Sequence, residues 1–148
     1  MKQTLSILII GALITLSVSC KKSGLKGVAS SLQGTWELHE SQVSITPDSV
    51  YPAGNGNKLS FDGMSYKIFL KGQLIRSGTY AIISYGPSDG SFCSMVPAGQ
   101  SGNKIVYDND NTRVMNIRIS DTELDTEAGC AAVDGQSNQK YWKLPNGQ

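Results

Sequence analysis

The alternation of apolar and polar residues with a period of two constrains the fold of this chain more than any other feature. From about residue 32 onward, apolar side chains recur at every second position within short segments, and turn-forming Gly, Asn, Asp and Pro residues separate those segments. This pattern is typical of β-strands joined by turns, because successive side chains of a strand point to opposite faces. No segment beyond residue 31 keeps the 3.6-residue apolar period of a helix. We therefore expect an all-β domain over residues 32–148.

About eight segments of this kind follow one another along the chain. They lie at residues 36–45, 59–61, 66–70, 74–85, 104–107, 114–119, 121–127 and 139–144, and the fifth strand either starts at Lys104 or also includes residues 92–96. The apolar phase slips between Glu40 and Val43, which indicates a bulge or bend in the first strand. Sequential strands with short connections favour an eight-stranded antiparallel up-and-down barrel. An open β-sandwich is the alternative.

Residues 1–19 have the composition of an N-terminal signal peptide for export. Lys2 supplies a positive charge, and Leu5 to Val18 are uncharged and almost wholly apolar. This stretch of about 14 residues is shorter than the roughly 20 that span a bilayer, but it suits the apolar region of a signal peptide. The alternatives are an ordinary secreted protein cut near Ser19, or an uncut signal anchor.

The run Leu16-Ser17-Val18-Ser19-Cys20 resembles the lipobox of bacterial lipoproteins, in the looser form that Bacteroidota lipoproteins use. The resemblance implies that the chain is cut before Cys20 and that lipid on Cys20 anchors the protein to a membrane. Residues 20–31 are then expected to form a flexible lipidated tether, with three lysines either near anionic head groups or in solvent. The expected location is the bacterial cell envelope, on the outer membrane and facing the periplasm, since no acidic run follows Cys20.

Charge and cysteine content limit the partners of the exported domain. Removal of the signal peptide leaves 12 basic and 12 acidic side chains, so no excess of positive charge points to a nucleic-acid partner. Cys93 and Cys130 remain once Cys20 is acylated, and in an oxidising compartment we expect them to form a disulfide. Two free thiols or a metal pair are the alternatives. A zinc site needs about four ligands, and His39 is the only histidine.

Three short motifs resemble those of lipocalins, and of bacterial lipocalin-like lipoproteins in particular. They are Gly34-Thr35-Trp36, Gly78-Thr79-Tyr80 and Tyr141-Trp142-Lys143-Leu144, in an order that covers roughly residues 32–146. The Thr-Asp-Tyr motif of typical lipocalins is absent. The resemblance implies a barrel with one open mouth that often takes a small apolar molecule. It also implies that Trp36 closes the barrel base, with Lys143 or Arg118 packed across its ring.

The inward face of the barrel is expected to line any ligand cavity. The candidates, each a member of a period-two apolar set, are Tyr66, Ile68, Tyr80, Ile82, Met115 and Ile117. An eight-stranded barrel can either be filled by side chains or hold one small ligand. We therefore expect a membrane-anchored protein that binds a small hydrophobic ligand. The alternative is a non-enzymatic interaction or accessory lipoprotein with a filled barrel.

Residues suited to catalysis or metal binding are sparse. His39 lies on the strand face opposite Trp36, without a sequence signal for an orienting partner, and is expected at the exposed surface. Acidic residues alternate over 121–127, as on the solvated outer face of a strand. Residues 108–112 lack the glycine and closing glutamate of a calcium loop, and are expected to form a turn rich in Asp and Asn. We expect no enzyme activity, no cofactor and no metal.

Overall fold

The computed structural model describes residues 23–43, 46–87, 99, 101–129 and 135–145. The predictions for the signal peptide, for lipidation of Cys20, for the Cys93–Cys130 disulfide and for a strand over 92–96 lie outside the described residues.

The described part of the chain is nearly all β, with strands that pair only in antiparallel fashion. The elements are α1 (Ser23–Leu32), β1 (Gly34–Val43), β2 (Ser49–Val50), β3 (Lys58–Asp62), β4 (Ser65–Leu70), β5 (Gln73–Tyr85), β6 (Gly102–Tyr107), β7 (Val114–Ile119), β8 (Glu123–Ala128) and β9 (Ser137–Lys143). From β3 to β9 each strand pairs with the next, and β1 pairs with both β3 and β9. These eight strands close on themselves, which confirms the predicted up-and-down barrel and rules out the sandwich.

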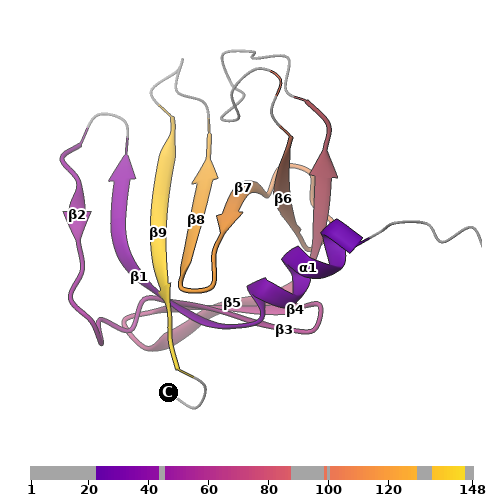
Figure 1. Ribbon diagram of the computed structural model, residues 1–148. Coiled ribbons are helices and arrows are strands. Elements are labelled where there is room, and N and C mark those ends of the chain that lie inside the picture. The colour runs from indigo at the N-terminus through magenta and orange to yellow at the C-terminus, as the bar shows by residue number, and fades with distance from the viewer. Residues whose placement is uncertain (1–22, 44–45, 88–98, 100, 130–134, 146–148) are drawn as a thin grey trace, which may run out of the picture.

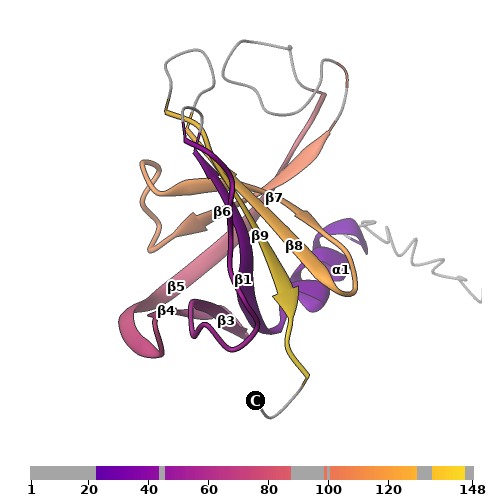
Figure 2. The same ribbon diagram turned by 90° about the vertical axis from the view of Figure 1, so that its left-hand side faces the viewer.

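The barrel is bent at β5, the longest of the described strands. Its first part pairs with β4, and its second part, from Tyr80 to Tyr85, pairs with β6. As a result β3, β4 and the start of β5 cross the bottom of the molecule, while β6 to β9 stand above them (Figure 1). Seen from the side, the β4–β5 hairpin and the β6–β7 hairpin reach the same side of the molecule, one above the other (Figure 2).

Residues 23–31, predicted to belong to a flexible tether that begins at residue 20, form most of helix α1, and residues 20–22 lie outside the described residues. Leu32 at its end is fully buried, the Trp36 indole N–H donates to the Leu32 carbonyl (2.8 Å), and Lys143 Nζ donates to the Ser31 carbonyl (3.1 Å). Two of the last carbonyls of the helix, which have no partner within it, are thus satisfied by the barrel. The sequence SGLKGVASSL contains two glycines and three serines, which form helices weakly. Contacts with the barrel therefore stabilise α1, and local propensity does not reveal it.

The bulge in β1 lies slightly earlier than the sequence predicts. The pairing with β9 shifts register between Leu38 and Glu40, so His39 is the extra residue. The His39 ring stacks on the Trp142 ring with centroids 3.6 Å apart and is half-buried, which corrects the expectation of an exposed histidine. Beyond the bulge, β1 no longer pairs with β3. Glu40 and Ser41 pair instead with the two-residue strand β2.

The described residues form a hydrophobic core that fills part of the barrel. Its buried members are Leu32, Trp36, Leu38, Leu59, Phe61, Tyr66, Tyr80, Ile105, Tyr107, Ile117, Leu124 and Tyr141. Phe61 packs edge-on against Tyr80 (5.1 Å between ring centroids), and Tyr66 packs in the same way against Tyr107 (4.7 Å). Such aromatic pairs favour defined ring geometries. The core side chains that border the rest of the barrel interior are therefore held in fixed positions.

Candidate ligand-binding cavity

A cavity of about 630 Å³ lies between the β4–β5 hairpin and the β6–β7 hairpin. Its inner wall is apolar and includes Leu38, Leu59, Ile68, Met115 and Tyr141. Leu70 and Ile75, on the β4–β5 hairpin, line its outer part and remain 52% and 58% exposed. The volume falls within the range of about 300–1,000 Å³ that is usual for pockets that bind small molecules.

The structure places two of the six predicted lining residues, Ile68 and Met115, on the wall of this cavity. The other four point inward without reaching the cavity wall: Tyr66, Tyr80 and Ile117 are buried in the core, and Ile82 packs against it. A period of two identifies the inward face of a strand, but it does not say how deep in the barrel each side chain lies. The same signal marks Leu38, Leu59 and Tyr141, which the prediction omitted.

Trp36 lies at a filled part of the barrel. It is fully buried, and Lys143 Nζ lies 4.9 Å from the centroid of its ring, within the range of a cation–π contact. Arg118, the other residue considered for this contact, is mostly exposed and pairs with Asp125 at 3.4 Å. Lys143 therefore links Trp36 to the Ser31 carbonyl at the end of α1.

The charged side chains that line the cavity are basic. Its basic members are Lys58, Lys71, Arg76 and Arg113, and no aspartate or glutamate is among the described residues that line it. Arg113 forms an ion pair with Asp108. The other three basic residues form no ion pair with any residue that the structure describes.

Asp108 holds Arg113, one of the residues that line the cavity, in an ion pair. Its carboxylate accepts hydrogen bonds from the Tyr66 hydroxyl (2.9 Å) and from the Thr79 N–H (3.0 Å), and it also pairs with Arg113. The hydrogen bonds from Tyr66 and Arg113 hold the pKa of the Asp108 carboxyl below its usual range. A Cβ on Gly78 would lie 1.9 Å from Asp108 Oδ1, so only glycine there lets the carboxylate approach. This contact gives a physical reason for glycine in the Gly78-Thr79-Tyr80 motif.

Glu37 holds a loop on the outer face of β1, and the sequence gives no sign of this role. The residue is only 6% exposed, and its carboxylate accepts hydrogen bonds from the N–H groups of Gly54 (2.7 Å) and Gly56 (3.1 Å). Bonds of this kind, to a charged acceptor, are stronger than those between neutral groups. In a strand pattern Glu37 looks like an ordinary outward-facing acid, because the loop that covers it comes from a later segment.

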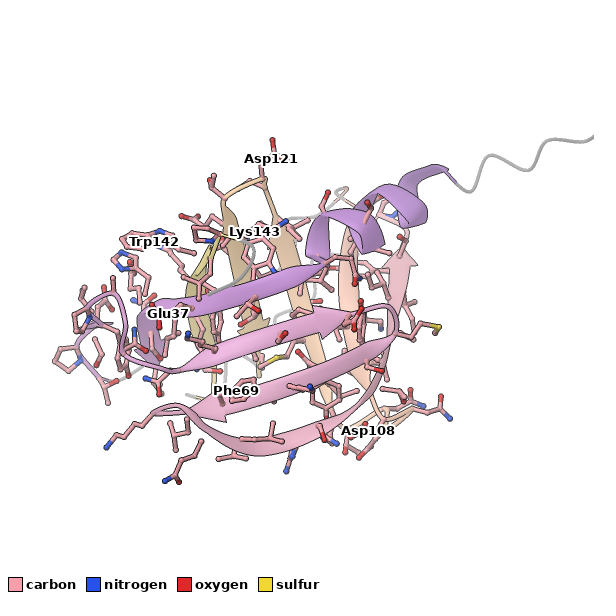
Figure 3. All side chains as sticks on the ribbon, turned by 90° about the horizontal axis from the view of Figure 1, so that it is seen from below. Glu37, Phe69, Asp108, Asp121, Trp142 and Lys143 are labelled. Atoms are coloured by element: carbon pink, nitrogen blue, oxygen red, sulfur yellow. The ribbon has the colours of Figure 1, made fainter. Side chains whose placement is uncertain are left out.

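The loop held by Glu37 in turn supports the tip of the β4–β5 hairpin. The Gly72 N–H donates to the Gly56 carbonyl (2.8 Å), and the Lys71 N–H donates to Asn57 Oδ1 (2.9 Å). Figure 3 shows Glu37 and Asp108 well apart on the underside of the molecule. Glu37 thus supports the hairpin tip, where β4 ends, and Asp108 binds Tyr66 near the start of the same strand.

The remaining candidates for chemistry lie where the sequence suggests, with the exception of Asp121. Glu123, Asp125 and Glu127 alternate with buried Leu124 and Thr126, as expected for the outer face of β8. Asp121 lies before the strand rather than within it. Asp110 Oδ1 accepts the Thr112 N–H (2.9 Å), as in the predicted turn.

The chain matches no protein-family model, no curated protein and no solved structure. In the described ranges, no group of three or more His, Cys, Asp or Glu residues is placed to hold a metal ion. The described residues also include no helix that is long and apolar enough to cross a membrane.

Proposed function

We propose that this chain is a lipid-anchored, lipocalin-like protein of the bacterial envelope that binds a small apolar molecule in its barrel. The cavity of about 630 Å³ is the observation that carries the proposal. Its walls supply apolar surface, and the core beside it supplies a rigid scaffold, the combination that small-molecule sites require. A completely filled barrel, as the interaction-protein alternative needs, would leave no space of this size.

Replacement of Met115 by tryptophan is expected to reduce ligand uptake about tenfold, a loss of roughly 1.4 kcal/mol in binding free energy. Met115 is partly buried and faces the cavity, so a larger side chain occupies ligand space without displacing core residues. Uptake is measured as tritiated decanol retained by the full chain in nanodiscs of zwitterionic lipid, after subtraction of empty discs.

Ile83→Trp is the matched control, because Ile83 is exposed and does not line the cavity. This control should bind decanol like the wild type. Equal losses in the two variants, or no retention by the wild-type chain, would reject the cavity as a binding site.

The proposed lipid anchor rests on the apolar stretch Leu5 to Val18 and on the lipobox-like run that ends at Cys20. Helix α1 begins at Ser23 and its end packs against the barrel, so only Lys21 and Lys22 separate the acylated cysteine from the helix. An anchor at Cys20 therefore keeps the barrel close to the membrane surface.

Cys20→Ala is expected to abolish acylation and to release the protein from the detergent phase, or to leave it uncut. The sulfur of Cys20 is the proposed attachment point, and several acyl chains are needed for stable anchoring. Labelling with a clickable fatty acid, followed by detergent-phase partition, measures both effects. Cys93→Ala serves as the control for loss of a cysteine. Wild-type labelling that persists in Cys20→Ala would disprove the assignment.

A further inference from the structure

The geometry points to a ligand that carries an anionic head group on its apolar tail. This inference rests on the proposed function and specifies the class of ligand: an amphiphile with a carboxylate, phosphate or sulfate at one end. The apolar inner wall suits the tail, and the unbalanced positive charge of the lining suits the head.

Arg76 is placed to meet the head group by its register in the sheet. It pairs with Ile68 on the neighbouring strand, and side chains directly opposite each other in a sheet share one face. Since Ile68 lies on the cavity wall, the Arg76 side chain starts from the same face and ends in solvent, where it is exposed. A guanidinium in this position can bind a carboxylate or a phosphate through two parallel hydrogen bonds.

Lys71 adds a second cation at the turn of the same hairpin. Its backbone has a φ of 51°, in the left-handed region, and its N–H is held by Asn57. Together with the neighbouring Gly72–Gly56 hydrogen bond, this fixes the turn that carries the Lys71 side chain. Neither Lys71 nor Arg76 has an acidic partner among the described residues, so both charges remain available to a ligand.

The apolar residues of the hairpin connect the two parts of the site. Leu70 and Ile75 flank the turn, line the cavity and are more than half exposed. A tail that leaves the inner wall therefore passes over apolar surface before it reaches Lys71 and Arg76. The order of these groups, with apolar wall, apolar hairpin and then cations, is that of an amphiphile with one charged end.

The test compares ligands that share a tail and differ in the head. Tritiated decanoate, decanol and decylamine are offered separately to the full chain in zwitterionic nanodiscs at neutral pH, and retention by empty discs is subtracted. We expect retention of decanoate to exceed that of decanol about tenfold, as for two partly solvated charge contacts, and decylamine to bind least.

Two double variants separate a local from a general effect of charge. Lys71→Gln with Arg76→Gln should lower the decanoate-to-decanol ratio to about twofold or less. Lys104→Gln with Arg118→Gln removes the same charge from side chains that do not line the cavity and should leave the ratio as in the wild type.

The possible failures of the two proposals are distinguishable. If decanol and decanoate are retained equally, or if both double variants lower the ratio alike, the head-group inference is wrong while the cavity still binds apolar molecules. If neither ligand is retained, the proposed function fails and the inference with it.

Discussion

Replacement of Trp36 by alanine is expected to lower the free energy of unfolding by about 4 kcal/mol, within the usual range for loss of a buried tryptophan. Trp36 is fully buried, and its indole N–H donates to the Leu32 carbonyl. Its removal leaves a large void and leaves that carbonyl without its partner. It also removes the ring on which the Lys143 ammonium group lies. Urea denaturation followed by far-ultraviolet circular dichroism measures the loss.

Trp142→Ala is the matched control for Trp36→Ala. Trp142 is 45% exposed and stacks on His39 on the outside of the barrel. Its loss should cost about 1 kcal/mol, the order of one aromatic contact at the surface. If the two tryptophan variants were equally destabilised, the structural role given to Trp36 would be wrong.

Glu37→Gln is expected to lower the free energy of unfolding by about 3 kcal/mol, although the two side chains have almost the same shape. A carboxylate accepts both N–H groups of the loop, whereas an amide presents only one oxygen, and its NH₂ group would face a second donor. Each hydrogen bond to a charged group contributes about 1.5–3 kcal/mol. Urea unfolding measures the total, and amide hydrogen exchange at Gly54 and Gly56 locates the effect.

Glu40→Gln provides the same substitution three residues further along β1. Glu40 forms a partly exposed ion pair with Lys140 at 3.2 Å. Pairs of this kind contribute about 0–1 kcal/mol, so the control should be nearly neutral. A larger loss for Glu40→Gln than for Glu37→Gln would contradict the role of Glu37 in holding the loop.

The barrel was predictable because the alternation of apolar and polar residues within each strand shows which side chains face inward. Alternation over residues 114–119 and 139–144 needs no knowledge of the rest of the chain. By contrast, β2 consists of Ser49 and Val50 alone, and it pairs with β1 only beyond the bulge at His39. Helix α1 depends on its contacts with Trp36 and Lys143, so its own sequence contains too weak a signal.

The cavity was predictable only in part, because its position depends on how β5 bends. Ile68 and Met115 reach the cavity wall, whereas Tyr80 and Ile117 have the same period and lie in the core. The sequence pattern alone indicates that Arg76 is an ordinary solvent-exposed charge. Only its pairing opposite Ile68 shows that it shares a sheet face with the cavity wall. Glu37 depends on a loop that returns from the following segment, and one strand pattern cannot encode such a contact.

The pairing of β1 with β9 also limits the speed and order of folding. Glu40 and Lys140, which face each other across this pair, are 100 positions apart in the chain. Hairpins such as β3–β4 and β8–β9 form from neighbouring residues, but closure of the barrel has to wait for the last strand and overcome the entropy of a long loop. Sheets with such distant contacts fold in milliseconds to seconds rather than microseconds. Until closure, β1 and β9 each present an open edge to other chains, and that interval is when a newly made molecule is most prone to aggregate.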